Sequence, residues 1–153
     1  MRLNAVSDDK GRRKSGASPG ENNRLVRPAG DPLRVLIVED EAMVQHLLED
    51  MVESYGGDVV AVTPWGTTAI MLAGQHRPDV ALMDVALYGD LDGIEAARTI
   101  MARFQIPIVF ITGKTDPDLG PRIAALHGPE LLDKPATANR LIPAIRRACK
   151  LTD

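Results

Sequence analysis

The sequence predicts an α/β protein built on a doubly wound parallel sheet. From about residue 33 onward, short apolar runs alternate with helical patterns, which is the signature of βαβ units. The runs at 35–38, 80–83 and 108–111 are apolar throughout, as expected for strands that helices cover on both faces. Right-handed crossovers between such strands place helices on both sides of a five-stranded sheet.

The expected strands lie near 33–38, 58–62, 79–83, 106–111 and 130–132, and the expected helices near 41–55, 65–75, 92–104, 116–126 and 136–150. In the first helix, Met43, Leu47 and Met51 share one apolar stripe. The fourth helix has the weakest pattern, because Pro117 and Pro121 fall in its first turns and a later proline removes a backbone hydrogen bond. We expect that helix to be short, irregular or mobile.

The chain divides at the Pro- and Gly-containing stretch 28–32 into a disordered tail at 1–31, a folded domain at 32–150 and a short end at 151–153. Residues 1–32 carry seven Lys/Arg against four Asp/Glu, or +3, and the remainder carries −6. An acidic folded body argues against duplex DNA as the main partner. The basic tail could touch an anionic surface, but its composition favours a solvated segment.

The composition also predicts where the protein works. No apolar run approaches the roughly 20 residues that span a bilayer, and the N-terminus lacks the apolar core of a secretory signal. Cys149 is the only cysteine, which excludes an internal disulfide and fits a reducing cytosol. We therefore expect a cytoplasmic protein with no membrane partner.

Polar residues follow four of the expected strands, at the edge where parallel sheets bind ligands. Glu39 and Asp40 follow the first strand and Asp84 the third. Adjacent buried acids raise one another's pKa unless a cation binds between them, and Mg²⁺ prefers a few carboxylates with water and phosphate oxygens. Helix capping is the alternative role for such acids; it would explain Glu41 and one of the other two.

A carboxylate at the end of a central strand can also act as a nucleophile and form an aspartyl phosphate, a role that Asp84 would fill. Lys134 and Mg²⁺ would neutralise the transferred phosphoryl oxygens, and Thr112 can donate a hydrogen bond to one of them. Taken alone, Thr112 would be a strand-end cap and Lys134 a solvated lysine. Pro135 is a candidate cis proline that would aim Lys134 across the strand ends.

These motifs, together with Asp92-Gly93-Ile94-Glu95, resemble the receiver domain of two-component response regulators from about residue 33 to residue 149. The resemblance implies a flavodoxin-like (βα)5 fold with strand order 2-1-3-4-5. It implies Mg²⁺ bound by Glu39, Asp40, Asp84 and the backbone carbonyl of Ala86. It also implies Asp84 as phosphoacceptor, Thr112 as switch hydroxyl and Lys134 as phosphate-contacting lysine.

The sequence departs from the common receiver pattern at three places. The loop after Asp84 is one residue longer and lacks the usual proline. Leu131 occupies the position of the switch aromatic, and Ala136 follows Pro135 where an aromatic is frequent. The stretch 110–113, Phe-Ile-Thr-Gly, is similar to the Phe-Ala-Thr-Gly motif of some stand-alone receivers. Without the aromatic, we expect the signal to leave through residues 112–127.

We accordingly expect a single-domain response regulator, with no output domain after the last helix. A sensor histidine kinase would phosphorylate it, and it would signal to a downstream protein or phosphotransfer protein, or act as a phosphate sink. It would be a monomer or weak dimer and no enzyme beyond its own phosphorylation and dephosphorylation. A phosphatase with an aspartyl-phosphate intermediate fits less well, because Ala86 stands where its general acid is needed. A flavin- or nucleotide-binding protein would need a Gly-rich loop in place of Glu39-Asp40-Glu41.

Overall fold

All five expected strands are present in the computed structural model, which describes residues 20–113 and 117–151. They are β1 (Arg34–Val38), β2 (Asp58–Thr63), β3 (Val80–Met83), β4 (Ile108–Thr112) and β5 (Glu130–Asp133). They form one parallel sheet in the order β2-β1-β3-β4-β5. The predicted fold class and strand order are therefore confirmed.

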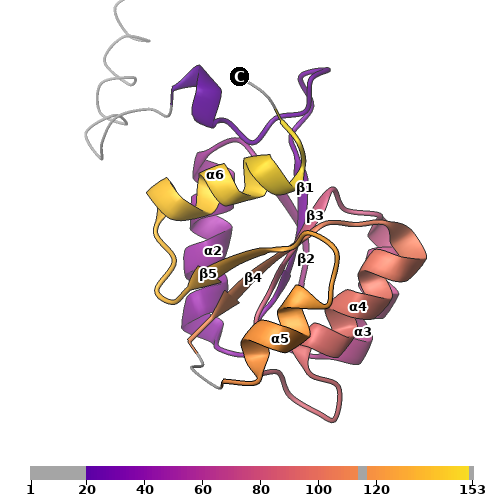
Figure 1. Ribbon diagram of the computed structural model, residues 1–153. Helices are drawn as coiled ribbons and strands as arrows, with labels where there is room; N and C mark the ends of the chain where they lie inside the picture. Colours follow the sequence, from indigo (N-terminus) through magenta and orange to yellow (C-terminus); the bar gives the residue numbers. More distant parts are fainter. Residues whose placement is uncertain (1–19, 114–116, 152–153) are drawn as a thin grey trace, which may run out of the picture.

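Helices cover both faces of this sheet (Figure 1). They are α2 (Ala42–Ser54), α3 (Gly66–His76), α4 (Gly93–Phe104), α5 (Leu119–Ala124) and α6 (Ala138–Ala148), after a short 3-10 turn, η1 (Glu21–Asn23). The helices α2 and α6 pack on one face, and α3, α4 and α5 on the other. Within the described part of the chain, no helix is long and apolar enough to cross a membrane.

The sheet separates two apolar cores because successive side chains of a strand point to opposite faces. In β1, Leu36 and Val38 belong to the core under α3, α4 and α5, whereas Val35 and Ile37 belong to the core under α2 and α6. All four side chains are buried. This double burial explains why the strand is apolar throughout instead of alternating with polar residues.

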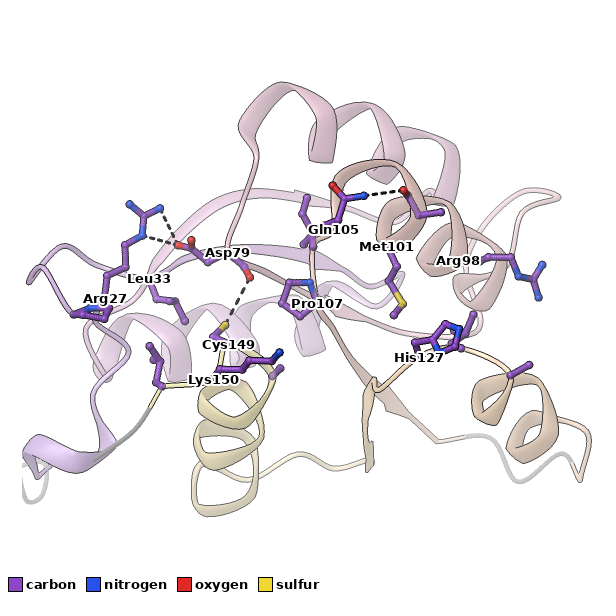
Figure 2. Close-up of a pocket in the computed structure, with 17 residues that line it drawn as sticks. Arg27, Leu33, Asp79, Arg98, Met101, Gln105, Pro107, His127, Cys149 and Lys150 are labelled. Atoms are coloured by element: carbon purple, nitrogen blue, oxygen red, sulfur yellow. Dashed lines mark hydrogen bonds and ion pairs between the residues drawn. The ribbon is translucent and has the colours of Figure 1, made fainter.

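The predicted boundary of the tail at residue 31 is wrong, because residues 24–31 pack against the domain. The side chain of Leu25 is fully buried beside Leu33 in the core under α2 and α6. Its backbone N–H donates to the carbonyl of Tyr55 (2.7 Å) and its carbonyl accepts from Leu33 (2.9 Å). Arg27 pairs with Asp79 at 2.9 Å (Figure 2). One buried apolar side chain and one ion pair thus attach a segment whose polar composition had suggested a solvated tail. Residues 1–19 lie outside the described part of the chain.

The fourth predicted helix is short, as expected. The helix α5 spans six residues, and Pro121 is its third residue. Its N-cap residue is Asp118, whereas the expected start of the helix, residue 116, lies outside the described residues. The prolines and Gly120 account for its length, because each disfavours a continuous helical ladder.

Candidate functional site

The ends of β1, β3 and β5 bring two buried acids together with one lysine. The Asp84 backbone N–H donates to the carbonyl of Val38 (2.9 Å), which places Asp84 beside the first residue after β1. The ammonium nitrogen of Lys134 lies 2.9 Å from Asp84 Oδ2 and 2.9 Å from Glu39 Oε1. The side chains of Glu39 and Asp84 are only 1% and 5% exposed. A single cation therefore joins two carboxylates that water scarcely reaches.

Lys134 reaches this position from the end of β5. Its backbone N–H donates to the carbonyl of Thr112 (3.0 Å), which continues the pairing of β4 with β5. The Lys134–Pro135 peptide bond is cis, as the sequence analysis anticipated. The Thr112 side chain is buried at the end of β4. Thr112 and Lys134 thus lie at the same edge of the sheet as Glu39 and Asp84.

One carboxylate oxygen from each of Glu39, Asp40 and Glu41 lies within 4.8 Å of the other two. Among the described residues this is the one group that could hold a metal ion, and it differs from the predicted set. Glu41 takes part in it, whereas the carboxylate of Asp84 is engaged by Lys134. Glu41 occupies the N-cap position of α2, but its side chain makes no capping hydrogen bond. Glu41 therefore stands at the helix end, as the capping alternative expected, although no capping hydrogen bond accounts for its carboxylate.

The surroundings of the Glu39 carboxylate also support the binding of a divalent cation by the acid cluster. Glu39 Oε2 accepts a hydrogen bond from the Glu41 backbone N–H (3.0 Å). Glu39 Oε1 is buried, and its polar contact among the described residues is the ion pair with the Lys134 ammonium, 2.9 Å away. A buried carboxylate oxygen offers lone pairs beyond the one that faces Lys134, and oxygen is the ligand atom that Mg²⁺ prefers.

The charges of these residues depend on one another. Burial raises the pKa of Glu39 to about 7, and the nearby charge of Asp84 adds to the effect, while the Glu41 N–H and the Lys134 ammonium oppose it. Burial lowers the pKa of Lys134, but its contacts with Glu39 and Asp84 outweigh burial and raise it overall. Lys134 therefore remains a cation between the two acids.

The loop after Asp84 approaches the site through its backbone. The Ala86 N–H donates to Asp84 Oδ1 at 3.3 Å. A Cβ atom added to Gly93 would lie 1.9 Å from the carbonyl oxygen of Asp84, so only glycine fits there. Further along the loop, Tyr88 packs edge-on against Trp65 with ring centroids 5.4 Å apart. Trp65 thus has a packing partner, although its side chain is 45% exposed.

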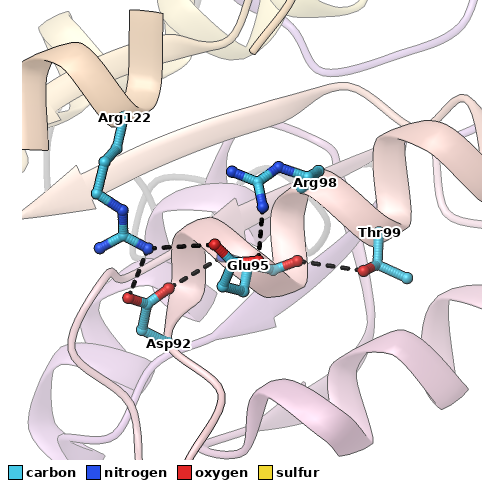
Figure 3. A network of polar contacts seen from close by, with 5 residues as sticks. All are labelled: Asp92, Glu95, Arg98, Thr99 and Arg122. Atoms are coloured by element: carbon cyan, nitrogen blue, oxygen red, sulfur yellow. Dashed lines mark hydrogen bonds and ion pairs between the residues drawn. The ribbon is translucent and has the colours of Figure 1, made fainter. Parts of the chain in front are cut away.

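Sequence reasoning missed two polar contacts around the site. Gln45 on α2 donates from Nε2 to the backbone carbonyl of Glu39 (2.6 Å), which orients the residue that begins the acid cluster. Arg122 on α5 pairs with Asp92 at 2.8 Å and approaches Glu95 at 3.5 Å (Figure 3). No local periodicity signals a contact between residues 30 positions apart. An Arg in one helix and an Asp at the N-cap of another are both common, so their presence in the sequence does not predict an ion pair between them.

The Arg122 contact ties the weak helix α5 to the end of the loop that follows Asp84. Asp92 caps α4 by accepting from the Glu95 N–H (2.9 Å). Burial raises the pKa of Asp92, but this hydrogen bond and the ion pair with Arg122 outweigh burial and lower it. The same pair raises the pKa of Arg122. On β5, Leu131 is 47% exposed, so the position of the missing aromatic lies at the surface.

Comparison with protein families agrees with this arrangement of sheet, acids and lysine. The family model of the response regulator receiver domain matches residues 35–146. This match extends over more than half of the chain and includes every predicted site residue. The chain therefore belongs to the response regulator receiver family.

Individual relatives agree with the assignment. The transcriptional regulatory protein PdtaR of Mycobacterium tuberculosis is 38% identical over 120 residues, which is 78% of this chain and 58% of PdtaR. The receiver domain of a modulated diguanylate cyclase from Desulfovibrio desulfuricans G20 superposes with a TM-score of 0.75 at 38% identity, covering 78% of this chain and 95% of that domain. The PhyR receiver domain of Erythrobacter litoralis gives a TM-score of 0.66 at 28% identity, covering 80% and 94%. The chain thus spans little more than half of PdtaR.

Proposed function

We propose that this protein accepts a phosphoryl group on Asp84 from the phosphohistidine of a sensor histidine kinase. The observation that carries the proposal is the pair of buried acids, Glu39 and Asp84, held by one lysine at the carboxyl edge of the sheet. Burying two like charges side by side costs free energy, so such pairs are found mainly where a functional site uses them. Membership of the receiver family supports the same chemistry.

In the proposed step, a carboxylate oxygen of Asp84 attacks phosphorus. A P–O bond forms, the P–N bond to the histidine breaks, and the imidazole nitrogen leaves with the electron pair. Lys134 already contacts Asp84 Oδ2, so its ammonium can pass to a phosphoryl oxygen without a new conformation of the strand. Hydrolysis reverses the modification: water attacks phosphorus and inorganic phosphate leaves, which restores the carboxylate.

Mg²⁺ belongs to the proposal as the second cation of the site. Glu39, Asp40, Asp84 and the backbone carbonyl of Ala86 would hold it, and Glu41 becomes a further candidate because it lies in the acid cluster. When bound, the ion neutralises the carboxylates and the charge on the transferred phosphoryl oxygens. Glu39 Oε1, which is buried and contacts Lys134, supports this ligand set because it has a further lone pair to offer.

The output of the switch is proposed to be a change in protein contacts. Thr112 would donate its hydroxyl to the phosphoryl group, and α5 follows it closely along the chain. Because Leu131 offers no ring that could turn inward, the change would pass through residues 112–127 to a downstream protein or phosphotransfer protein. The Phe-Ile-Thr-Gly stretch at 110–113 supports a stand-alone or phosphate-sink role in the cytoplasm.

Phosphorylation with a small donor tests the proposal directly. Acetyl phosphate or phosphoramidate with Mg²⁺ should add one base-labile phosphoryl group, measured by intact mass, and peptide mapping should place it on Asp84. Asp84→Asn should abolish uptake, whereas Asp90→Asn, which changes an exposed acid in the same loop, should not. Unchanged uptake by Asp84→Asn would refute the assignment. Lys134→Ala should still accept the group but lose any change in amide exchange at 112–127.

A further inference from the structure

A large cavity lies at the amino ends of the strands, at the opposite edge of the sheet from Asp84. Its volume is about 770 Å³, which is the size of a pocket for a small organic molecule. Asp79 and Pro107, which precede β3 and β4, form its floor, and Met101 on α4 lines one side. The segment containing Arg27 and the end of α6 close the other side. None of the residues assigned to phosphorylation lines it.

The walls of this cavity are mainly apolar, and their polar groups are largely engaged. Asp79 binds Arg27 and accepts from the backbone N–H of Arg34. The thiol of Cys149 faces the carbonyl of Asp79 at 3.7 Å. Figure 2 shows Pro107 between Cys149 and Lys150 on one side and Met101 and His127 on the other. A ligand body in this space would contact carbon and sulfur atoms for the most part.

A second cavity of about 530 Å³ adjoins the first and is cationic. The two share Pro28, Lys150 and Leu151 in their linings. Arg24, Arg146 and Lys150 line the second cavity, and no acid stands among its described lining residues. Arg146 donates to the backbone carbonyl of Arg24, which holds α6 against the N-terminal segment. No described carboxylate forms an ion pair with Arg24 or Lys150.

We propose that the two cavities form one binding site for an amphipathic organic anion. The apolar body would occupy the larger cavity, and its carboxylate, sulfonate or phosphate would lie against Arg24 and Lys150, beside Arg146. The charge pattern carries the argument, because the chain as a whole has a net charge of −3 and yet gathers cations at this mouth. An anion entering there meets the cations Arg24 and Lys150 while its body leaves water for an apolar wall.

The same charges disfavour two other occupants of the joined cavities, namely the segment 1–19 of this chain and a second copy of the chain. Residues 1–19 carry five Lys/Arg against two Asp/Glu, so this segment of the chain is itself cationic. It would place positive charge against Arg24 and Lys150, which costs free energy instead of gaining it. A second copy of the chain would bring the same cations to the interface, because a two-fold contact presents one surface to itself.

The fluorescent anion 8-anilinonaphthalene-1-sulfonate, ANS, is a suitable probe, and neutral N-phenyl-1-naphthylamine has the same body without the sulfonate. ANS should bind the full chain at one site, and amide shifts on binding should concentrate in residues 101–107, 125–127 and 148–151. Reversing two cations, in Arg24→Glu/Lys150→Glu, should weaken ANS about tenfold and leave the neutral probe unchanged. Arg140→Glu, an exposed reversal at the other end of α6, is the matched control. Ala102→Trp, which fills the larger cavity, should weaken both probes.

Far-UV circular dichroism and urea midpoints confirm that each variant is folded before its binding is compared. Equal loss of ANS by Arg140→Glu and by the double reversal would overturn the proposal, as would amide shifts confined to other surfaces. A gain of tenfold or more in ANS affinity on deleting residues 1–19 would identify the tail as the occupant. Loss of ANS binding as the protein self-associates would identify a second copy instead. None of these results depends on phosphorylation of Asp84.

Discussion

Leu25 provides a direct test of whether the segment before β1 is part of the folded domain. Its side chain is fully buried and packs with Leu33 and Val35 under α2 and α6. Replacing it by alanine in the full chain removes three methyl or methylene-sized groups from this core and leaves a cavity. If the segment instead behaved as a solvated tail, the same change would have almost no effect.

The expected loss can be worked out from the burial of Leu25. A fully buried Leu→Ala change costs about 3 kcal/mol, from the lost transfer free energy and the cavity together. The unfolding entropy of a domain of this size converts that loss into a fall of about 10 °C in Tm. Leu131→Ala is the matched control, because its side chain is 47% exposed, and it should cost less than about 1 kcal/mol.

Urea unfolding followed by far-UV circular dichroism measures these differences. A chain that begins at Gly20 keeps Leu25 and should retain the stability of the full chain. A chain that begins at Pro32 should lose at least as much as Leu25→Ala, because the ion pair of Arg27 with Asp79 is also removed. The packing argument fails if Leu25→Ala and Leu131→Ala have equal effects, or if removal of residues 1–31 leaves the midpoint unchanged.

Four further changes test the site and its surroundings. Mg²⁺ at ten times its Kd should raise the free energy of unfolding by about 1.4 kcal/mol, measured by thermal unfolding. Glu39→Gln should remove this gain, whereas the control Asp58→Asn, at the end of β2 far from the site, should keep it. Gly93→Ala should cost about 3 kcal/mol and slow phosphoryl uptake, because its Cβ would lie 1.9 Å from the Asp84 carbonyl oxygen; wild-type rates would contradict the close approach. Burial raises the pKa of Cys149 to about 12, helped by the charge of Asp79, so iodoacetamide at pH 8 should alkylate the native chain about a hundredfold or more slowly than the chain unfolded in urea. Arg122→Gln removes an exposed ion pair worth up to about 1 kcal/mol and should raise amide exchange in α5 up to about fivefold, with Arg103→Gln on α4 as the control; equal exchange in the two variants would show that the pair does not hold α5.

The sequence alone was sufficient to predict the secondary structure and the edge of the sheet that carries the acids. Strands covered on both faces must be apolar along their whole length, so 35–38, 80–83 and 108–111 were visible as continuous runs. The carboxyl ends of parallel strands share one edge, so Glu39, Asp84, Thr112 and Lys134 could be placed together before any side chain was positioned. These conclusions depend on the local pattern of apolar and polar residues, which can be read along the chain, and on the fixed right-handedness of the crossovers.

Only the tertiary structure decided which of these groups touch. Leu25 looked like an isolated apolar residue in a polar segment, and its burial depends on a space between α2 and α6 that no neighbouring residue signals. Glu41 stands at the N-cap of α2, and its carboxylate also joins the acid cluster. Lys134 holds Glu39 and Asp84 together. The pair of Arg122 with Asp92 and the two joined cavities likewise arise between segments far apart in the chain. Their physical cause is the same: periodicity determines the face on which a side chain lies, whereas the distance between two charged atoms depends on how separate elements pack.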